Sequence, residues 1–113
     1  MPVTVQRFTM ERAEKAHGGT IWAASFLPAD MTAPFDSAWG YLEEPGQLEP
    51  HAHPADEIYF IFQGRGRVVV DGEEAEVENG DVVSIPAGAQ HSIICDQAPL
   101  LWAAVWWDPV EKE

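Results

Sequence analysis

The sequence predicts an all-β domain, a sandwich or barrel of eight or so short strands. Two observations support this prediction: apolar runs of four to eight residues recur from residue 37 onward, and short turn signals separate them. The size of the chain is a third observation, because 113 residues, of which 46% are hydrophobic, suffice for one hydrophobic core. A chain this short buries only about two-thirds of the surface that its unfolded form exposes, which excludes a second domain.

The first third of the chain is mixed in pattern. We expect residues 1–36 to form an irregular or partly helical segment that packs on a barrel of residues 37–113 within one domain. Thr9 is a candidate N-cap for one or two helical turns, and Gly18-Gly19 would end them. The apolar run 21–27 indicates a strand that leads into a loop.

The barrel strands follow from short apolar or alternating runs rich in β-branched and aromatic residues. We expect them at 37–42, 58–62, 67–70, 74–78, 82–85, 91–95 and 100–107, with a short extended piece at 51–53. The acidic run in 73–78 alternates with apolar residues, which is typical of a strand with one solvated face.

Turn signals join these strands. They are Glu43-Glu-Pro-Gly, Gly64-Arg-Gly, Asp71-Gly72, Asn79-Gly80, Pro86-Ala-Gly-Ala and Asp96-Gln-Ala-Pro. Asp71-Gly72 is the strongest hairpin signal, because both central positions of a two-residue type I′ turn need positive φ.

The chain is acidic: six Lys and Arg stand against nineteen Asp and Glu, a net charge of −13 with neutral histidines. This balance argues against nucleic acid or an anionic membrane as a partner, because phosphate contacts need Lys or Arg. The first residues lack the apolar run of a signal peptide, and no stretch approaches the roughly 18 apolar residues that cross a bilayer. The single cysteine, Cys95, cannot form an intramolecular disulfide, so we expect a cytoplasmic protein.

Four polar residues carry the chemistry of the sequence. His51 and His53 lie between Pro50 and Pro54, which disfavour a helix, and on an extended chain side chains at i and i+2 point the same way. The two imidazoles therefore form a chelating pair.

Glu57 begins the next strand and shares a face with Tyr59 and Ile61, while His91 opens a much later strand that a barrel could bring alongside. Three imidazoles and a carboxylate suit one divalent transition metal, which could be Fe, Mn, Ni, Zn, Co or Cu. The alternative is that these are ordinary polar residues near a surface loop.

Two spaced motifs make the sequence resemble the cupin superfamily, in particular its small single-domain members. The first contains Gly46, His51, His53, Glu57 and Gly64, with six residues between Glu57 and Gly64 as in that family. The second contains Gly80, Pro86, Gly88 and His91. Only four residues separate Gly46 from His51 where the family usually has five, and Cys95 stands where it often has Asn.

The resemblance implies a double-stranded β-helix, or jelly-roll, barrel with a metal near its centre. It implies His51, His53, Glu57 and His91 as metal ligands, and many cupins form dimers. We expect a small metalloenzyme in which Glu57 tunes the metal and acts as a base. A dioxygenase is the first expectation, and isomerase, decarboxylase or lyase chemistry is possible. The alternative is a non-catalytic module that binds or senses a small ligand.

Aromatic side chains are candidates for the substrate pocket, although core packing would explain them equally well. The candidates are Tyr59, Tyr41, Trp39, Trp102 and, facing the same way as His91, Cys95. No arginine is placed to bind an anion inside the barrel, since Arg65 and Arg67 fall in a predicted turn. This favours a neutral aromatic small molecule as substrate. We expect no role for His17, which has no partner in its segment.

The other face of the 58–62 strand is apolar. Ile58, Phe60 and Phe62 alternate with Glu57 and Tyr59, so they point outward. A small barrel has few ways of covering such a face, and we therefore expect a homodimer.

Overall fold

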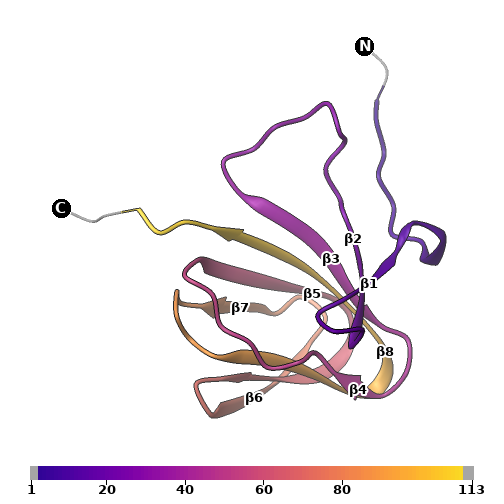
Figure 1. Cartoon of the computed structure of the whole chain (residues 1–113). Helices are drawn as coiled ribbons and strands as arrows, with labels where there is room; N and C mark the ends of the chain where they lie inside the picture. The colour runs from indigo at the N-terminus through magenta and orange to yellow at the C-terminus, as the bar shows by residue number, and fades with distance from the viewer. Residues whose placement is uncertain (1–2, 111–113) are drawn as a thin grey trace.

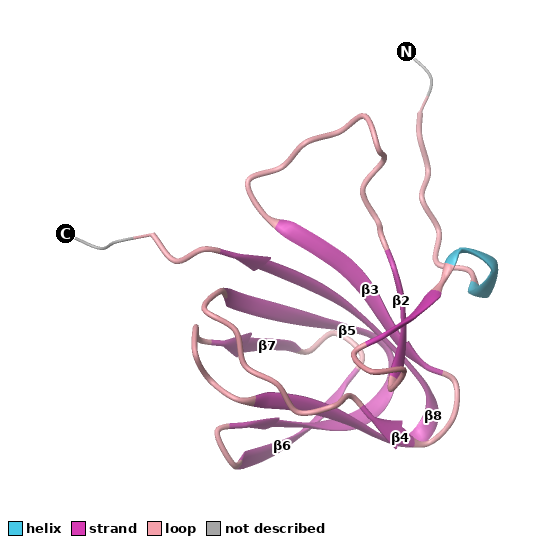
Figure 2. Cartoon of the chain, viewed as in Figure 1, coloured by secondary structure: helices cyan, strands magenta, loops and turns pink. Residues whose placement is uncertain are grey.

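The computed structural model describes residues 3–110. Residues 1–2 of the predicted N-terminal segment and residues 111–113 of the predicted barrel lie outside this range. The described chain is nearly all β-structure, with one short helical turn near its start (Figure 2). The elements are a 3₁₀ turn at Met10–Arg12 and the strands β1 Glu14–Ala16, β2 Ile21–Ala24, β3 Asp36–Leu42, β4 Gly46–Gln47, β5 Asp56–Val70, β6 Glu73–Glu78, β7 Val82–Ile85 and β8 His91–Trp107. The prediction of an all-β domain is confirmed. No helix in residues 3–110 is long and apolar enough to cross a membrane.

All of the strands belong to one antiparallel sheet that curls around a common interior (Figure 1). Its order is β1-β2-β3-β8-β5-β6, with β4 added to β8 and β7 added to β5. The sheet does not close: β1 lies at one end of this path and β6 at the other. The strands of the N-terminal segment thus extend the sheet formed by the rest of the chain.

Two long strands correct two of the predicted turns. β5 runs through Gly64-Arg-Gly and β8 runs through Asp96-Gln-Ala-Pro, with irregular pairing between the two strands there. A Cβ atom at Gly64 would collide with the carbonyl oxygen of Pro99, and one at Gly66 with that of Ile94. These glycines therefore permit two backbones to approach closely at a bulge, which in the sequence looks like a turn.

Of the one or two helical turns predicted near the N-terminus, the structure has a single short one. The helical residues are only Met10–Arg12, and the Thr9 side chain makes no capping hydrogen bond. The following residues form β1, which pairs with β2, and the ammonium group of Lys15 lies 4.4 Å from the centre of the Trp22 ring. Strand pairing outweighs the weak local helix preference of this stretch.

The alternation predicted for β5 is confirmed. Glu57, Tyr59 and Ile61 are buried, whereas Phe60 and Phe62 are 40% and 59% exposed. The hairpin at Asp71-Gly72 is also confirmed, with φ values of 47° and 83° at its two central residues. The face of β5 that carries Glu57 therefore points into the interior of the sheet.

Candidate metal centre

The His51 loop is attached to the start of β8 by backbone hydrogen bonds. His51 N–H donates to the His91 carbonyl at 3.1 Å, and His91 N–H donates to the His51 carbonyl at 2.8 Å. Two histidines that are 40 residues apart in the chain are thereby held as backbone partners. Their rings lie 4.2 Å apart, centre to centre.

Each of the three histidines has its ring oriented by a nearby main-chain carbonyl. Nδ1 lies 2.9 Å from the Glu49 oxygen in His51, 3.1 Å from the Ala55 oxygen in His53 and 2.9 Å from the Ala89 oxygen in His91. A carbonyl oxygen only accepts, so Nδ1 must carry the proton in every case. In all three rings Nε2 is therefore the nitrogen left to bind a metal, which in His53 and His91 would replace the present contact with Glu57.

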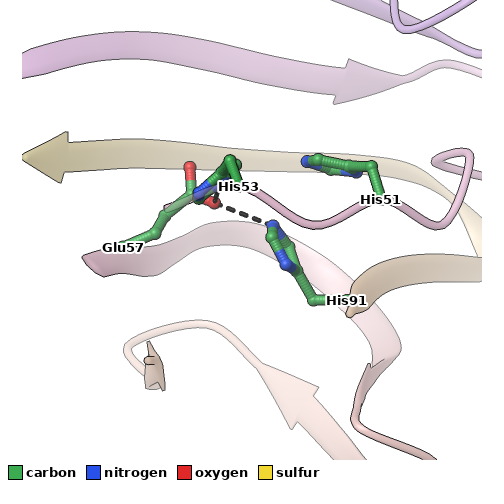
Figure 3. A group of neighbouring side chains, drawn as sticks. All are labelled: His51, His53, Glu57 and His91. Atoms are coloured by element: carbon green, nitrogen blue, oxygen red, sulfur yellow. Dashed lines mark hydrogen bonds and ion pairs between the residues drawn. The ribbon is translucent and has the colours of Figure 1, made fainter. Parts of the chain in front are cut away.

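Glu57 lies between two of these rings (Figure 3). Its Oε1 atom is 3.1 Å from Nε2 of His53 and 3.0 Å from Nε2 of His91. The Glu57 residue is only 6% exposed, and a carboxylate so deeply buried needs partners of opposite charge or strong hydrogen-bond donors. The described residues supply imidazoles for that purpose.

The four side chains together fit a metal ion. One ligand atom from each of His51, His53, Glu57 and His91 lies within 4.8 Å of every other. Ligand atoms bonded to one ion at about 2.1 Å lie at most about 4.2 Å apart, so small side-chain adjustments would complete the coordination. The set of three imidazoles and one carboxylate is also a donor set that first-row transition metals accept.

The local environment shifts the pKa values of this group in opposite directions. Burial would lower the pKa of His91, but its hydrogen bonds with Glu57 and with the Ala89 carbonyl outweigh burial and the net pKa is raised. Burial lowers the pKa of His51. The pKa of Tyr59 is well above its ordinary value because of burial and the nearby Glu57 charge, so its hydroxyl stays protonated.

A cavity of about 210 Å³ opens onto this group. Three of the predicted pocket residues, Trp39, Tyr59 and Trp102, line it. Tyr41 and Cys95 are not among the described residues of its wall: Tyr41 stacks on Phe8 at 4.9 Å, and Cys95 is buried in the core. The remaining wall is mostly small or apolar, from Ile21, Ala23, Ala38, Gly40, Leu48, Ala104 and Trp106.

No arginine or lysine is among the described residues of the cavity wall. Arg67 is engaged elsewhere, with nitrogens 2.7 Å from Glu74 and 2.7 Å from Asp96. Arg65 lies 3.5 Å from Glu78. Both arginines line a larger hollow of about 490 Å³, a surface groove without the histidine group and with four carboxylate residues in its wall.

His17, for which no partner was expected, lies beside the histidine group. Its ring lies 4.5 Å from the His51 ring, and it lines the cavity. Burial, followed by the neighbouring His51, lowers its pKa. The sequence holds one signal for this position. His17 directly precedes Gly18-Gly19, and a glycine pair marks a tight turn in which a histidine is unusual.

The cupin domain family matches residues 41–106, a range that includes all four side chains of the group. The chain belongs to the cupin family. This assignment confirms the resemblance of the two motifs and identifies the curled, unclosed sheet as a cupin-type barrel. The candidate metal-binding group of this cupin lies entirely within the matched region.

Curated relatives of this cupin include enzymes. A dimethylsulfoniopropionate lyase of Ruegeria pomeroyi is 37% identical over 92 residues, covering 80% of this chain and 60% of that protein. An acireductone dioxygenase of Leptospira biflexa is 32% identical over 92 residues, covering 73% of this chain and 45% of that protein. The cupin thus spans 60% and 45% of the length of these two relatives, less than two-thirds in each case.

Solved structures agree on the fold. A Cupin 2 conserved barrel domain protein from Salinispora arenicola superposes with a TM-score of 0.83 at 24% identity, covering 96% of this cupin and 91% of that chain. At this identity the likeness shows the fold alone. The N-terminal strands of this cupin, which lie outside the family match, are therefore part of an architecture found in another barrel.

Proposed function

We propose that this cupin binds one divalent transition metal through His51, His53, Glu57 and His91. The observation that supports the proposal is the shared orientation of the three rings: each Nδ1 is hydrogen-bonded to the main chain, which leaves Nε2 as the nitrogen that can bind a metal. The metal, when bound, would supply a Lewis acid or a redox centre with open coordination positions. This chain's residues would hold it, orient a ligand beside it and exclude water.

We further propose that the cupin acts on a small organic molecule. The cavity of about 210 Å³ corresponds to roughly seven water molecules, at about 30 Å³ each. Its aromatic wall, which includes Trp39 and Trp102, suits an apolar or onium-bearing body. With no Arg or Lys among the described wall residues, an anionic end of the substrate would be drawn to the metal itself.

Two reactions fit this site, and each has a relative that carries its name. A dioxygenase reaction is the first candidate, because a small enediol or catechol would offer two oxygens to the metal. A lyase reaction is the second, because it needs a base beside the bound carbon acid. Glu57 is the proposed catalytic residue in both, because it lines the cavity and a carboxylate can accept a proton.

We expect metal-dependent turnover in one of two assays. The cupin loaded with Fe(II), Mn(II) or Ni(II) is tested for oxygen uptake with catechols and small enediols, and for release of dimethyl sulfide from dimethylsulfoniopropionate. Removing the metal with a chelator should abolish the activity, and adding it back should restore it. One equivalent of bound metal with no turnover in either assay, together with tight binding of a small ligand, would instead support the non-catalytic binding module.

We propose a homodimer that covers the outer face of β5. Phe60 and Phe62 are 40% and 59% exposed, and Val82, 55% exposed, lies opposite Phe60 in the pairing of β5 with β7. A second copy of this chain would bury this patch against itself around a two-fold axis. We also propose a cytoplasmic location, because a chain with a single cysteine fits a reducing compartment.

The dimer is tested by light scattering after gel filtration. The wild-type protein should have twice the chain mass of 12.5 kDa. Phe62→Asp should shift it to the monomer mass, whereas Val110→Asp, which changes another exposed apolar residue beyond the end of β8, should leave the dimer intact. A wild-type monomer at about 100 µM would contradict the proposal.

A further inference from the structure

The turn between β1 and β2 forms part of the cavity mouth. Of the described residues that line the cavity, His17 alone is exposed, whereas Glu57 and Tyr59 at the other side of the group are buried. A ligand that enters the cavity from solvent therefore meets the His17 imidazole, and the part of a bound ligand that faces solvent lies beside it.

The backbone of this turn favours residues other than histidine. His17, Gly18 and Gly19 have φ values of 52°, 69° and 82°, three consecutive left-handed residues. Glycine adopts this conformation without strain, whereas a residue with a Cβ atom is disfavoured in it. The imidazole at position 17 is thus present despite a backbone that glycine would suit better, which is a common feature of ligand-contacting residues.

A chain of hydrogen bonds fixes the turn to the metal-ligand loop. The Thr20 hydroxyl donates to the His17 carbonyl at 2.7 Å and accepts from the Glu49 amide at 3.1 Å. The Glu49 carbonyl in turn accepts from Nδ1 of His51. One residue, Glu49, therefore positions both the His17 turn and the His51 ring, so the two imidazoles are held in a constant relation.

The two nitrogens of the His17 ring remain available. In the described chain, the rings of His51, His53 and His91 each have Nδ1 bonded to a carbonyl, whereas no hydrogen bond involves the ring nitrogens of His17. His17 also does not belong to the group whose ligand atoms converge. Its geometry thus suits a contact with a ligand on the metal and not with the metal itself.

We propose that His17 hydrogen-bonds to the end of a metal-bound ligand that faces the cavity mouth, so that the site prefers ligands with a polar group at that end. This inference rests on the metal site proposed above. It adds a specificity-determining residue from the N-terminal segment, outside the matched cupin region. The ligand class is a small molecule with an oxygen donor for the metal and a hydrogen-bonding group at its opposite end.

The test uses the full chain loaded with Co(II) and two matched probes. Catechol offers only the two oxygens for the metal, while 4-nitrocatechol adds a hydrogen-bond acceptor at the far end of the ring. Binding of each probe is measured by optical titration, and bound Co(II) is measured by elemental analysis. His17→Gly removes the imidazole at a position where glycine has no backbone strain, so it should fold at least as well as the wild type.

We expect His17→Gly to weaken the binding of 4-nitrocatechol about fivefold to tenfold, the value of one hydrogen bond. Catechol binding and Co(II) content should change by less than about twofold. Thr20→Val, which cuts the link to Glu49, should weaken 4-nitrocatechol binding in the same direction, and His17→Asn should recover part of the loss.

Three results would overturn the inference. Equal loss for both probes would show a purely structural or stacking role, and equal affinity of wild type and His17→Gly for 4-nitrocatechol would show no contact. Loss of Co(II) in His17→Gly would make His17 a metal ligand. A wild-type chain that binds no Co(II) would instead refute the metal site itself, and this result is distinguishable from the other three.

Discussion

His91→Ala is expected to reduce the bound metal from one equivalent to nearly none. His91 contributes one of three imidazoles to the group, and its Nε2 lies 3.0 Å from Glu57. Loss of residues that merely support metal ligands costs about 10-fold to 100-fold in affinity, so loss of a ligand should cost at least about 100-fold. The metal content of protein purified without an affinity tag, measured by elemental analysis, tests this directly.

Stability gives a second readout of the same variant. A metal that binds only the folded chain raises the free energy of unfolding by about 2.7 kcal/mol at a free concentration of 100 times its Kd. The wild-type melting temperature should therefore rise with added metal, and that of His91→Ala should not. His17→Gly is the matched control, because it removes a nearby imidazole outside the ligand group and should keep its metal. Full metal content in both His51→Ala and His91→Ala would refute the site.

Gly64→Ala is expected to destabilise the fold by about 3 kcal/mol. The new Cβ atom would collide with the carbonyl oxygen of Pro99 at the place where the pairing of β5 with β8 is irregular. Both colliding groups belong to the backbone or are attached directly to it. Overpacking of this kind costs about 1–3 kcal/mol, and a φ of 103° adds strain for any residue with a Cβ atom. The free energy of unfolding from urea denaturation measures the effect.

Gly72→Ala separates the collision from the backbone strain. Gly72 also has a positive φ, 83°, but a Cβ atom there would meet nothing within 4 Å. Its cost should be about 1 kcal/mol, so the difference between the two variants reports the close approach of the two strands. Equal destabilisation by the two substitutions would show that β5 and β8 do not approach so closely at Gly64.

Local signals in the sequence predicted most strand positions and the face that each presents. Alternation placed Glu57, Tyr59 and Ile61 inward, and Asp71-Gly72 marked a true hairpin, because these features depend on neighbours within a few residues. Gly64 and Gly66 predicted a turn where β5 continues. A glycine that permits a turn and one that permits a neighbouring backbone to approach have the same local signature, and only the partner strand distinguishes them.

The sequence likewise predicted one part of the candidate site and missed another. Spacing within the two motifs brought the four ligand residues to notice, and the structure places their ligand atoms within 4.8 Å of one another. His17 escaped notice because its neighbour, His51, is 34 positions away in the chain and the connection runs through the hydrogen bonds of Thr20 and Glu49. Cavity walls are assembled from every part of the chain, so sequence spacing carries little information about them.

The hydrogen bonds that orient the three histidines have an evolutionary consequence. Their acceptors are main-chain carbonyls of Glu49, Ala55 and Ala89, each two residues from the ring it orients. A substitution at any of these three positions changes a side chain and leaves the acceptor in place. Much of the cavity wall comes from β2, β3 and β8, where side chains can change without removing these carbonyl acceptors. If the proposed site holds a metal, such a barrel can change its ligand preference through successive wall substitutions while the orientation of the three rings is inherited unchanged.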